Sequence, residues 1–348
     1  MARPGDPGGG GDMVATIEPG IGRFGVQADG VAVERIGIAS GEVSAAVLTR
    51  GAILQDLRLA GVDWPLTLGF PELAPYENGL PSCGALVGPV ANRISGAAAT
   101  LDGEVHRFEA NEAGVRTLHG GSTGTHRQVW DVVERSEAAV TLGLALADGL
   151  GGFPGARRLR ARFEVAGSAL TLTVTGETDR PTWLNIANHS YWHLDGWGFA
   201  GQRLRVAADR YLPTGEGNVP TGEIAEVAGT DRDFREAREV APGAPVLDKN
   251  WCLSSGRVAL RPVAWLSGVR GVTMELSTTE PGLQLYDGRG LDSGGVASLA
   301  GRAAEPYAGL ALEAQGWPDA PNRPEFPSVR LDPGEVYEQV TRWDFRVA

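Results

Sequence analysis

The sequence predicts an all-β protein, a large sandwich of antiparallel sheets. Short segments alternate apolar and polar side chains with a period of two, which places one face in a core and the other in water. The chain holds 50 glycines and 22 prolines, residues that commonly separate strands at turns. Helical periodicity is nearly absent, and only Phe234 to Val240 could form a couple of helical turns.

Two neighbouring segments carry the clearest strand pattern. Leu159 to Val165 alternates strictly between apolar and charged residues, and Ala169 to Thr178 repeats the alternation with threonines at the outward positions. Both patterns indicate strands with one buried face and one solvated face. Further strands are expected within residues 43–59 and at residues 202–206, 272–277, 283–286 and 309–315.

The chain of 348 residues is predicted to form one folded domain behind a short tail. Residues 1–20 are rich in glycine and proline, so they cannot bury much apolar surface and are expected to be disordered. No linker or strong internal repeat divides the remainder, and large β-sandwiches often run as one unit at this length. Residues 21–348 are therefore expected to form a single domain.

Composition limits the possible partners. The formal net charge of −12 disfavours nucleic acid and anionic membranes, so a neutral small molecule fits better. No apolar run is long enough for a membrane-spanning helix, and the first residues lack the apolar stretch of a secretory signal, so a cytoplasmic protein is expected. Cys83 and Cys252 lie far apart and predict buried thiols rather than a disulfide framework or a thiolate metal site.

The segment Asn185 to Gly196 concentrates polar and aromatic groups directly after a predicted strand. It reads N-I-A-N-H-S-Y-W-H-L-D-G, so Asn188 and His189 are followed by Tyr191 and Trp192. Aromatic faces stack on the apolar C–H surface of a sugar, while amides and imidazoles hydrogen-bond its hydroxyls. On this segment alone, a buried core histidine beside a core tryptophan explains the pattern equally well.

Four more segments are polar where a purely structural β-protein has little need of such groups. Each is a weak signal alone, because short motifs of this kind usually reflect turn chemistry or surface polarity. They are Gly88 to Ile94 with Asn92 and Arg93, Leu118 to Gly121 with His119, Val246 to Asn250 with Asp248, and Leu312 to Gln315 with Glu313.

Taken together and in this order, these segments resemble the galactose mutarotase (aldose 1-epimerase) family. The resemblance runs from about Val31 to Phe345, which is most of the chain. Its blocks are V-A-N-R-I at 90–94, L-H-G-G at 118–121, N-H-S-Y-W at 188–192, A-D-R-Y-L-P-T-G-E-G-N-V-P-T-G-E-I at 208–224, T-T-E-P-G-L-Q-L-Y at 278–286 and P-D-A-P-N-R-P-E-F-P-S-V at 318–329.

The resemblance implies a galactose mutarotase-like β-supersandwich that interconverts the α and β anomers of a free aldose, such as galactose or glucose, without a cofactor or metal. It makes Glu313 the general base and His189 the general acid, and this mechanism requires His189 to be protonated at the start. A monomer or a homodimer is expected. By the same resemblance, the sugar hydroxyls are bound by Arg93, His119, Asp248 and Gln284, with Asn92 in support.

The chain also departs from the family pattern. Pro89 stands where family members often have arginine, and Thr125-His126 replaces a more usual aromatic–acidic pair. Ala314 and Gly316 flank the expected base where bulkier residues are common. These differences leave the preferred sugar open.

Other chemistries compete with this interpretation. His189 and His193 lie four residues apart, on the same face if the strand continues, but no third metal ligand of matching character is nearby. Glu275 or Glu280 could pair with Glu313 in a glycosidase, although Glu275 fits the polar side of a strand and Glu280 a turn.

Two further functions stay open within the same fold. A phosphosugar epimerase needs several convergent basic groups, and only Arg93 is found among the expected site residues. A sugar-binding or regulatory module without catalysis is the other, because a fold does not fix a function. The presence of both an acid and a base favours an enzyme.

Overall fold

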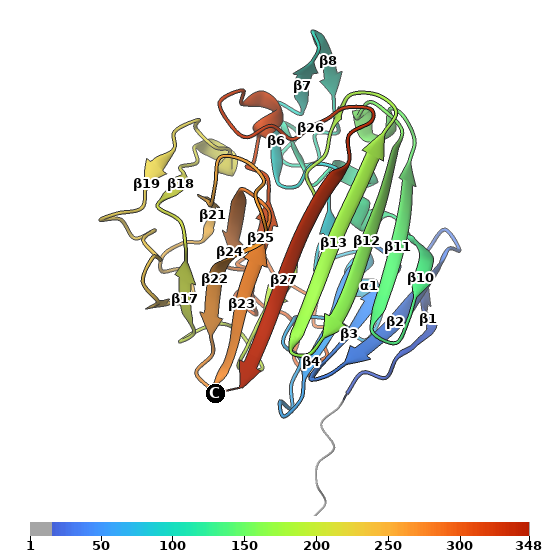
Figure 1. Cartoon of the computed structure of the whole chain (residues 1–348), viewed down its shortest axis with the longest axis vertical. Helices are drawn as coiled ribbons and strands as arrows, with labels where there is room; N and C mark the ends of the chain where they lie inside the picture. The colour runs from blue at the N-terminus through green and yellow to red at the C-terminus, as the bar shows by residue number, and fades with distance from the viewer. Residues whose placement is uncertain (1–15, 348) are drawn as a thin grey trace, which may run out of the picture.

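A computed structural model describes residues 16–347, which form layered antiparallel sheets (Figure 1). The largest sheet has nine strands, and every neighbouring pair in it is antiparallel. The C-terminal strand lies in its middle and joins its two halves. In order across the sheet the strands are β10 (Asp131–Arg135), β11 (Ala139–Leu146), β12 (Arg157–Ala166), β13 (Ala169–Thr178), β27 (Tyr337–Val347), β23 (Val272–Thr278), β22 (Arg261–Ser267), β17 (Arg203–Val206) and β20 (Arg238–Glu239).

Two smaller sheets lie behind the large sheet in Figure 1, one behind each half. Buried side chains of all three sheets belong to one hydrophobic cluster. The four-stranded sheet consists of β1 (Gly20–Val26), β2 (Ala32–Ser40), β3 (Val43–Leu48) and β4 (Ile53–Leu59). The six-stranded sheet consists, in order, of β16 (Tyr191–Trp192), β25 (Leu310–Gln315), β24 (Gly282–Tyr286), β21 (Asp248–Cys252), β18 (Arg210–Leu212) and β19 (Ala225–Glu226).

The remaining elements are short. Four two-stranded sheets pair β5 (Leu86–Val87) with β15 (Ala187–Asn188), β6 (Arg93–Ser95) with β9 (Arg116–Leu118), β7 (Ala98–Leu101) with β8 (Glu104–Arg107), and β14 (Thr182–Trp183) with β26 (Arg330–Leu331). Within residues 16–347, no helix is long and apolar enough to cross a membrane. The helical elements are α1 (Ala74–Glu77) and the 3-10 turns η1 (Gly121–Thr123), η2 (Thr125–Arg127), η3 (Leu150–Gly152), η4 (Glu216–Asn218) and η5 (Ala320–Asn322).

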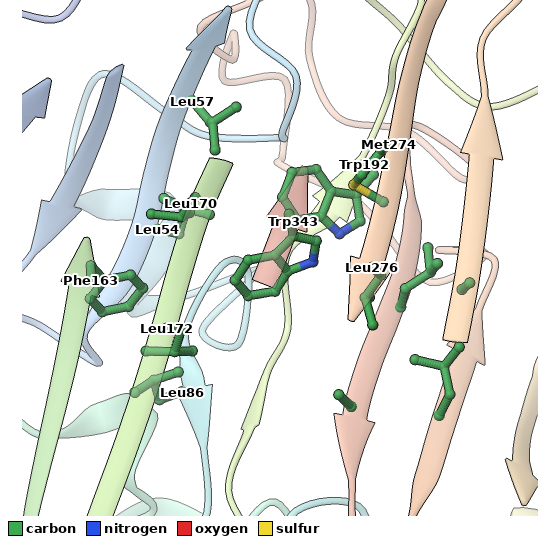
Figure 2. Close-up of a cluster of buried hydrophobic side chains, with 14 of the residues drawn as sticks. Leu54, Leu57, Leu86, Phe163, Leu170, Leu172, Trp192, Met274, Leu276 and Trp343 are labelled. Atoms are coloured by element: carbon green, nitrogen blue, oxygen red, sulfur yellow. The ribbon is translucent and has the colours of Figure 1, made fainter. Parts of the chain in front are cut away.

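The core fills the space between the sheets, as Figure 2 shows. Trp192 and Trp343 meet at its centre, with ring centroids 5.6 Å apart. Side chains of β13 lie on one side of this pair and side chains of β23 on the other. Burying large aromatic and aliphatic groups in this way is the main stabilising term of the sandwich. The labelled neighbours include Leu170, Leu172, Met274 and Leu276.

The predicted alternation is confirmed. β12 and β13 pair over their full length, from Arg157 opposite Thr178 to Ala166 opposite Ala169. In β12 the residues at 157, 159, 161, 163 and 165 are buried, while those at 158, 160, 164 and 166 are exposed. The strands expected at 202–206, 272–277, 283–286 and 309–315 form as β17, β23, β24 and β25. Among the described residues, Cys83 and Cys252 are free thiols, the first buried and the second half-buried.

Two expectations differ from the structure. The helical turns expected at Phe234 to Val240 are wrong, because the backbone groups there bond to β17 instead. Val206 donates to the carbonyl of Phe234, Val240 donates to that of Gln202, and β20 pairs with β17. Of the tail expected at 1–20, residues 1–15 lie outside the described part. Ile17 is buried with its N–H on the Ser44 hydroxyl, and Gly20 begins β1, so ordered chain starts before residue 21.

Leu172→Ala is expected to destabilise the protein by about 2–5 kcal/mol, because it removes a buried side chain from the centre of the core. The matched control is Thr173→Ala on the opposite face of β13, where the change should cost about 1 kcal/mol or less. Urea denaturation of both variants measures the difference. Equal losses for the two variants would contradict the core position of Leu172.

Candidate active site

A pocket of about 410 Å³ gathers polar side chains from distant parts of the chain. It lies on the face of the six-stranded sheet turned away from the main core, since the alternate residues of β25 and β24 face that core. The structure brings together all seven residues expected to catalyse the reaction or bind the sugar: Asn92, Arg93, His119, His189, Asp248, Gln284 and Glu313.

Strand register places the acidic and amide groups side by side. Glu313 lies directly opposite Gln284 in the β25–β24 pair, and Asp248 lies opposite Tyr286 in the β24–β21 pair. Directly opposed residues point to the same face of a sheet, as do residues two apart on one strand. All four side chains therefore converge on the pocket, while Leu312 and its neighbours on the other face enter the core.

His189 reaches the same point from the loop between β15 and β16. Its N–H donates to the carbonyl of Ala85 and its carbonyl accepts from Gly84, so the main chain is fixed on both sides. The ring Nε2 lies 3.7 Å from Oε1 of Glu313, and the ring centroid lies 5.0 Å from that of Tyr191. Both the imidazole and the carboxyl are buried, at 6% and 2% side-chain exposure.

Asn92 connects His119 and Arg93 through hydrogen bonds. Its N–H donates to Nδ1 of His119, its carbonyl accepts from the N–H of His119, and its side-chain oxygen accepts from the N–H of Arg93. Asn92 and His119 both adopt positive φ, at 61° and 54°, which asparagine and histidine tolerate better than most residues. Gly120 follows because a Cβ there would overlap the carbonyl of Gly88.

Asp248 is held by two hydrogen-bond donors and one ion pair. Nε2 of Gln284 lies 2.8 Å from Oδ1, Nδ2 of Asn218 lies 2.9 Å from Oδ2, and the guanidinium of Arg93 lies 3.8 Å away. Arg93 itself forms a bidentate pair with Glu112 at 2.9 Å. Such paired geometry fixes the donor groups in space, as recognition of sugar hydroxyls requires.

A family model described as aldose 1-epimerase matches residues 34–344. The chain belongs to the aldose 1-epimerase family. Galactose mutarotase from Rattus norvegicus is 33% identical over 333 residues, covering 92% of this chain and 96% of that protein. Aldose 1-epimerase from Escherichia coli is 33% identical over 296 residues, covering 80% of this chain and 84% of that protein.

Solved structures confirm the predicted galactose mutarotase-like fold of this aldose 1-epimerase family member. An aldose epimerase homologue from C. elegans superposes with a TM-score of 0.84 at 28% identity, covering 91% of this chain and 100% of that one. A galactose 1-epimerase from Lactobacillus acidophilus gives 0.81 at 25% identity, covering 96% and 100%.

Burial sets the protonation of the central pair in this family member. It raises the pKa of Glu313 well above its usual range, and Asp248 adds to the rise while Arg93 opposes it. Burial lowers the pKa of His189 to about 4. These two shifts favour a protonated carboxyl and a neutral imidazole in the protein without sugar, the reverse of the expectation that His189 is protonated at the start.

His119 is also neutral, since burial and the nearby His189, His126 and Arg93 lower its pKa well below the usual value. Its Nδ1 accepts the Asn92 N–H, so Nε2 carries the proton and is a donor toward the pocket. Ligand atoms of His119, His189 and Glu313 lie within 4.8 Å of one another, a spacing that could hold a metal. Neither ring nitrogen of His119 offers a free lone pair while that hydrogen bond stands, so the trio suits hydrogen bonding better than metal binding.

Several residues singled out in the sequence lie elsewhere. Trp192 is fully buried in the core, since it follows Tyr191 on β16 and points to the other face. His193 is buried with its ring 6.0 Å from that of Trp197, outside the trio, because β16 ends before it. Among described residues the pocket lining excludes Glu275, which accepts from Trp265, and Glu280, which pairs with Arg257.

The pocket also contains residues that the sequence analysis did not single out. Glu112 binds Arg93, and Asn218 binds Asp248. Tyr286 and Arg289 also line the pocket. Asn218 and Tyr286 fall inside the family-like blocks at 208–224 and 278–286, which was the available signal. Glu112 falls outside every block, so only its contact with Arg93 reveals it.

The departures from the family pattern lie behind the pocket. Pro89, Thr125, His126, Ala314 and Gly316 are absent from the described lining. Thr125, for example, donates to the carbonyl of Leu86, and the N–H of Gly316 donates to Asn185. These residues therefore do not form the described surface of the pocket.

A larger cavity of about 720 Å³ lies between β18, β19 and residues 252–255 and 317–327. Its described lining contains no histidine, and its arginines are paired, Arg210 with Glu226 at 2.8 Å and Arg235 with Asp209 at 3.2 Å. This cavity therefore lacks an acid–base pair, and the smaller pocket is the candidate active site.

Glu313→Gln is expected to stabilise the protein at neutral pH. A carboxyl with a raised pKa binds its proton more tightly in the folded chain, so ionisation at higher pH weakens folding. The amide cannot ionise, so it should raise the free energy of unfolding at neutral pH. The gain should vanish as the pH falls below the usual glutamate range, where both states hold the proton.

Urea denaturation over a series of pH values measures this gain. The matched control is Glu338→Gln on the exposed face of β27, which should change stability little at any pH. A Glu313→Gln variant less stable than the parent at neutral pH would contradict the burial cost.

Proposed function

We propose that the protein is an aldose 1-epimerase that interconverts the α and β anomers of a free aldose such as galactose or glucose. The observation that carries the proposal is the buried pair of Glu313 and His189, whose Oε1 and Nε2 lie 3.7 Å apart. This spacing suits contacts to two neighbouring oxygens of one sugar ring, one on each group.

The reaction needs one base and one acid and no redox step. Glu313 takes the proton of the C1 hydroxyl, the C1–O5 bond breaks as the C1 carbonyl forms, and His189 gives its proton to O5. Rotation about C1–C2 presents the other carbonyl face. On closure His189 removes the O5 proton, O5 attacks C1, and Glu313 returns its proton to O1. Each general catalyst contributes about 10²–10⁴-fold.

Sugar binding moves the proton from Glu313 to His189, where this reaction requires it. Among the described residues Oε2 of Glu313 has no hydrogen-bond partner, so it is available to a sugar hydroxyl. A hydroxyl donating there favours the charged carboxylate, and the proton then passes to His189 at 3.7 Å. Arg93 favours the same charged form of Glu313. Arg93, His119, Asp248 and Gln284 bind the remaining hydroxyls, with Asn92 holding His119 and Arg93.

Charge pairing in the pocket argues against a phosphosugar as substrate. Arg93 is already paired with Glu112 and Asp248, and Arg289 is paired with Asp287 at 2.6 Å. A phosphate would have to compete with carboxylates for both arginines. A binding module without catalysis has no need of a base raised in pKa beside an acid, which is the arrangement typical of active sites.

The purified protein is expected to accelerate the change in optical rotation of fresh α-D-glucose or α-D-galactose. Glu313→Gln should lower kcat by about 10²-fold or more while sugar binding stays measurable by calorimetry, because the amide keeps the shape but cannot accept the proton. Glu338→Gln is again the control and should retain parental activity.

Three outcomes of this assay decide between the functions. Binding without acceleration for any common aldose would support the binding module. Acceleration with sugar 6-phosphates alone would support a phosphosugar epimerase. Full activity in Glu313→Gln would remove the proposed base.

The pH dependence follows from the shared proton. With Glu313 already protonated in the free protein, a second proton on His189 leaves no base, so kcat/KM should fall as the pH drops through about 4. As the pH rises through the raised pKa of Glu313, kcat/KM should fall again because the pair loses the proton it needs as an acid. Polarimetry corrected for the spontaneous reaction measures the profile, with fluorescence checking that the chain stays folded. An acid limb near the ordinary histidine value, about 6.5, would contradict this assignment.

A further inference from the structure

Two family-like blocks, at 208–224 and 318–329, take no part in the reaction described above. The first block reaches the pocket lining, and the second block contacts the first through Arg323. Residues 213–221, here called the rim loop, carry η4 and place Asn218 in the pocket lining. The rim loop contacts Asp248 directly and is connected to Arg93 through Arg116 and Glu112.

Asn218 is the point where the rim loop meets the site. Its Nδ2 donates to Oδ2 of Asp248 at 2.9 Å, while Gln284 occupies the other oxygen. Its φ of 57° lies in the left-handed region, where asparagine and glycine are favoured. Both the side chain and the backbone of this position therefore suit asparagine.

The neighbouring Gly217 connects the loop to Arg93. A Cβ at Gly217 would overlap the guanidinium of Arg116, so the loop packs directly on that group. Arg116 donates to Glu112 at 2.9 Å, and Glu112 holds Arg93. Arg93 in turn lies 3.8 Å from Asp248, which closes a ring of contacts around the pocket mouth.

The second block, residues 318–329, holds the rim loop through Arg323. Arg323 donates to the carbonyls of Pro220 and Thr221, at 2.6 and 3.4 Å, and to Asp319 at 3.3 Å. Asp319 is fully buried, accepts from Ser95, and donates its own N–H to the carbonyl of Arg93. The loop and the strand that carries Arg93 thus share one anchor.

We propose that Asn218, held in place through the Arg323–Asp319 anchor, is a positioning residue that fixes Asp248 for binding sugar hydroxyls. The inference rests on the proposed function. Asp248 is largely buried, and burial raises its pKa, so the amide donor also helps to keep it charged and correctly oriented. Asn218 acts through Asp248, so its loss affects sugar binding more than the chemical step.

Three substitutions at Asn218 separate its roles. Asn218→Gly keeps the backbone conformation and removes the amide, so KM should rise about tenfold with kcat changed less than about twofold. Asn218→Ala adds backbone strain and should be at least as severe. Asn218→Asp puts a second carboxylate beside Asp248, and KM should rise with pH as the proton that the two share is lost, which a purely structural role would not produce.

A substitution of Arg323, which lies outside the described pocket lining, tests the anchor. Arg323→Met should raise KM in the same direction as Asn218→Gly, and the double variant should be less than additive because both act through one loop. Arg330→Met is the matched control, since Arg330 lies in the same region but pairs with Asp102 and Asp332. It should leave KM unchanged.

Kinetics by polarimetry and sugar affinity by calorimetry are measured together, with urea denaturation confirming folding. An unchanged KM and affinity in Asn218→Gly, or an unchanged KM in a folded Arg323→Met, would overturn the inference. If the parent protein shows no mutarotation, the proposed function fails by itself. Weaker sugar binding by Asn218→Gly in calorimetry would still support the role of Asn218.

Discussion

The burial of the Glu313 carboxyl beside His189 is the constraint on which the rest of the structure depends. β25 is an interior strand, bonded to β24 on one side and β16 on the other, and the Glu313 side chain on it is only 2% exposed. A buried carboxyl without a full set of partners is costly. The surrounding sheets supply the apolar packing that offsets this cost, with Leu310 and Leu312 entering the core from the same strand.

Charge around this pair is balanced by residues that do not react. Arg93 sits between Glu112 and Asp248, and Arg289 pairs with Asp287. A paired arginine keeps donors in fixed positions without adding a net field that would attract anions. The pocket therefore suits a neutral polyhydroxy ligand. Within it, burial and Asp248 raise the pKa of Glu313.

The sequence was most informative where one face of a strand is buried and the other solvated. The alternation at 159–165 and 169–178 predicted β12 and β13 because polarity reports directly on such faces. It failed at 234–240, where Phe234 and Val240 both enter the core from an extended segment that bonds to β17 and the residue before it. It could not assign Trp192 either, since both the pocket and the core accept an aromatic ring, and only the register of β16 against β25 decides.

Strand residues and loop residues of the site are brought together by different physical means. Neighbouring strands lie about 4.8 Å apart in fixed register, so Glu313, Gln284 and Asp248 can meet only in one way once the sheet forms. The contacts of Glu112 and Asn218 depend on how loops fold back over that sheet, and no local pattern encodes them. The departures at Pro89 and Gly316 lie outside the described pocket lining, so these two residues are not placed to contact a sugar directly.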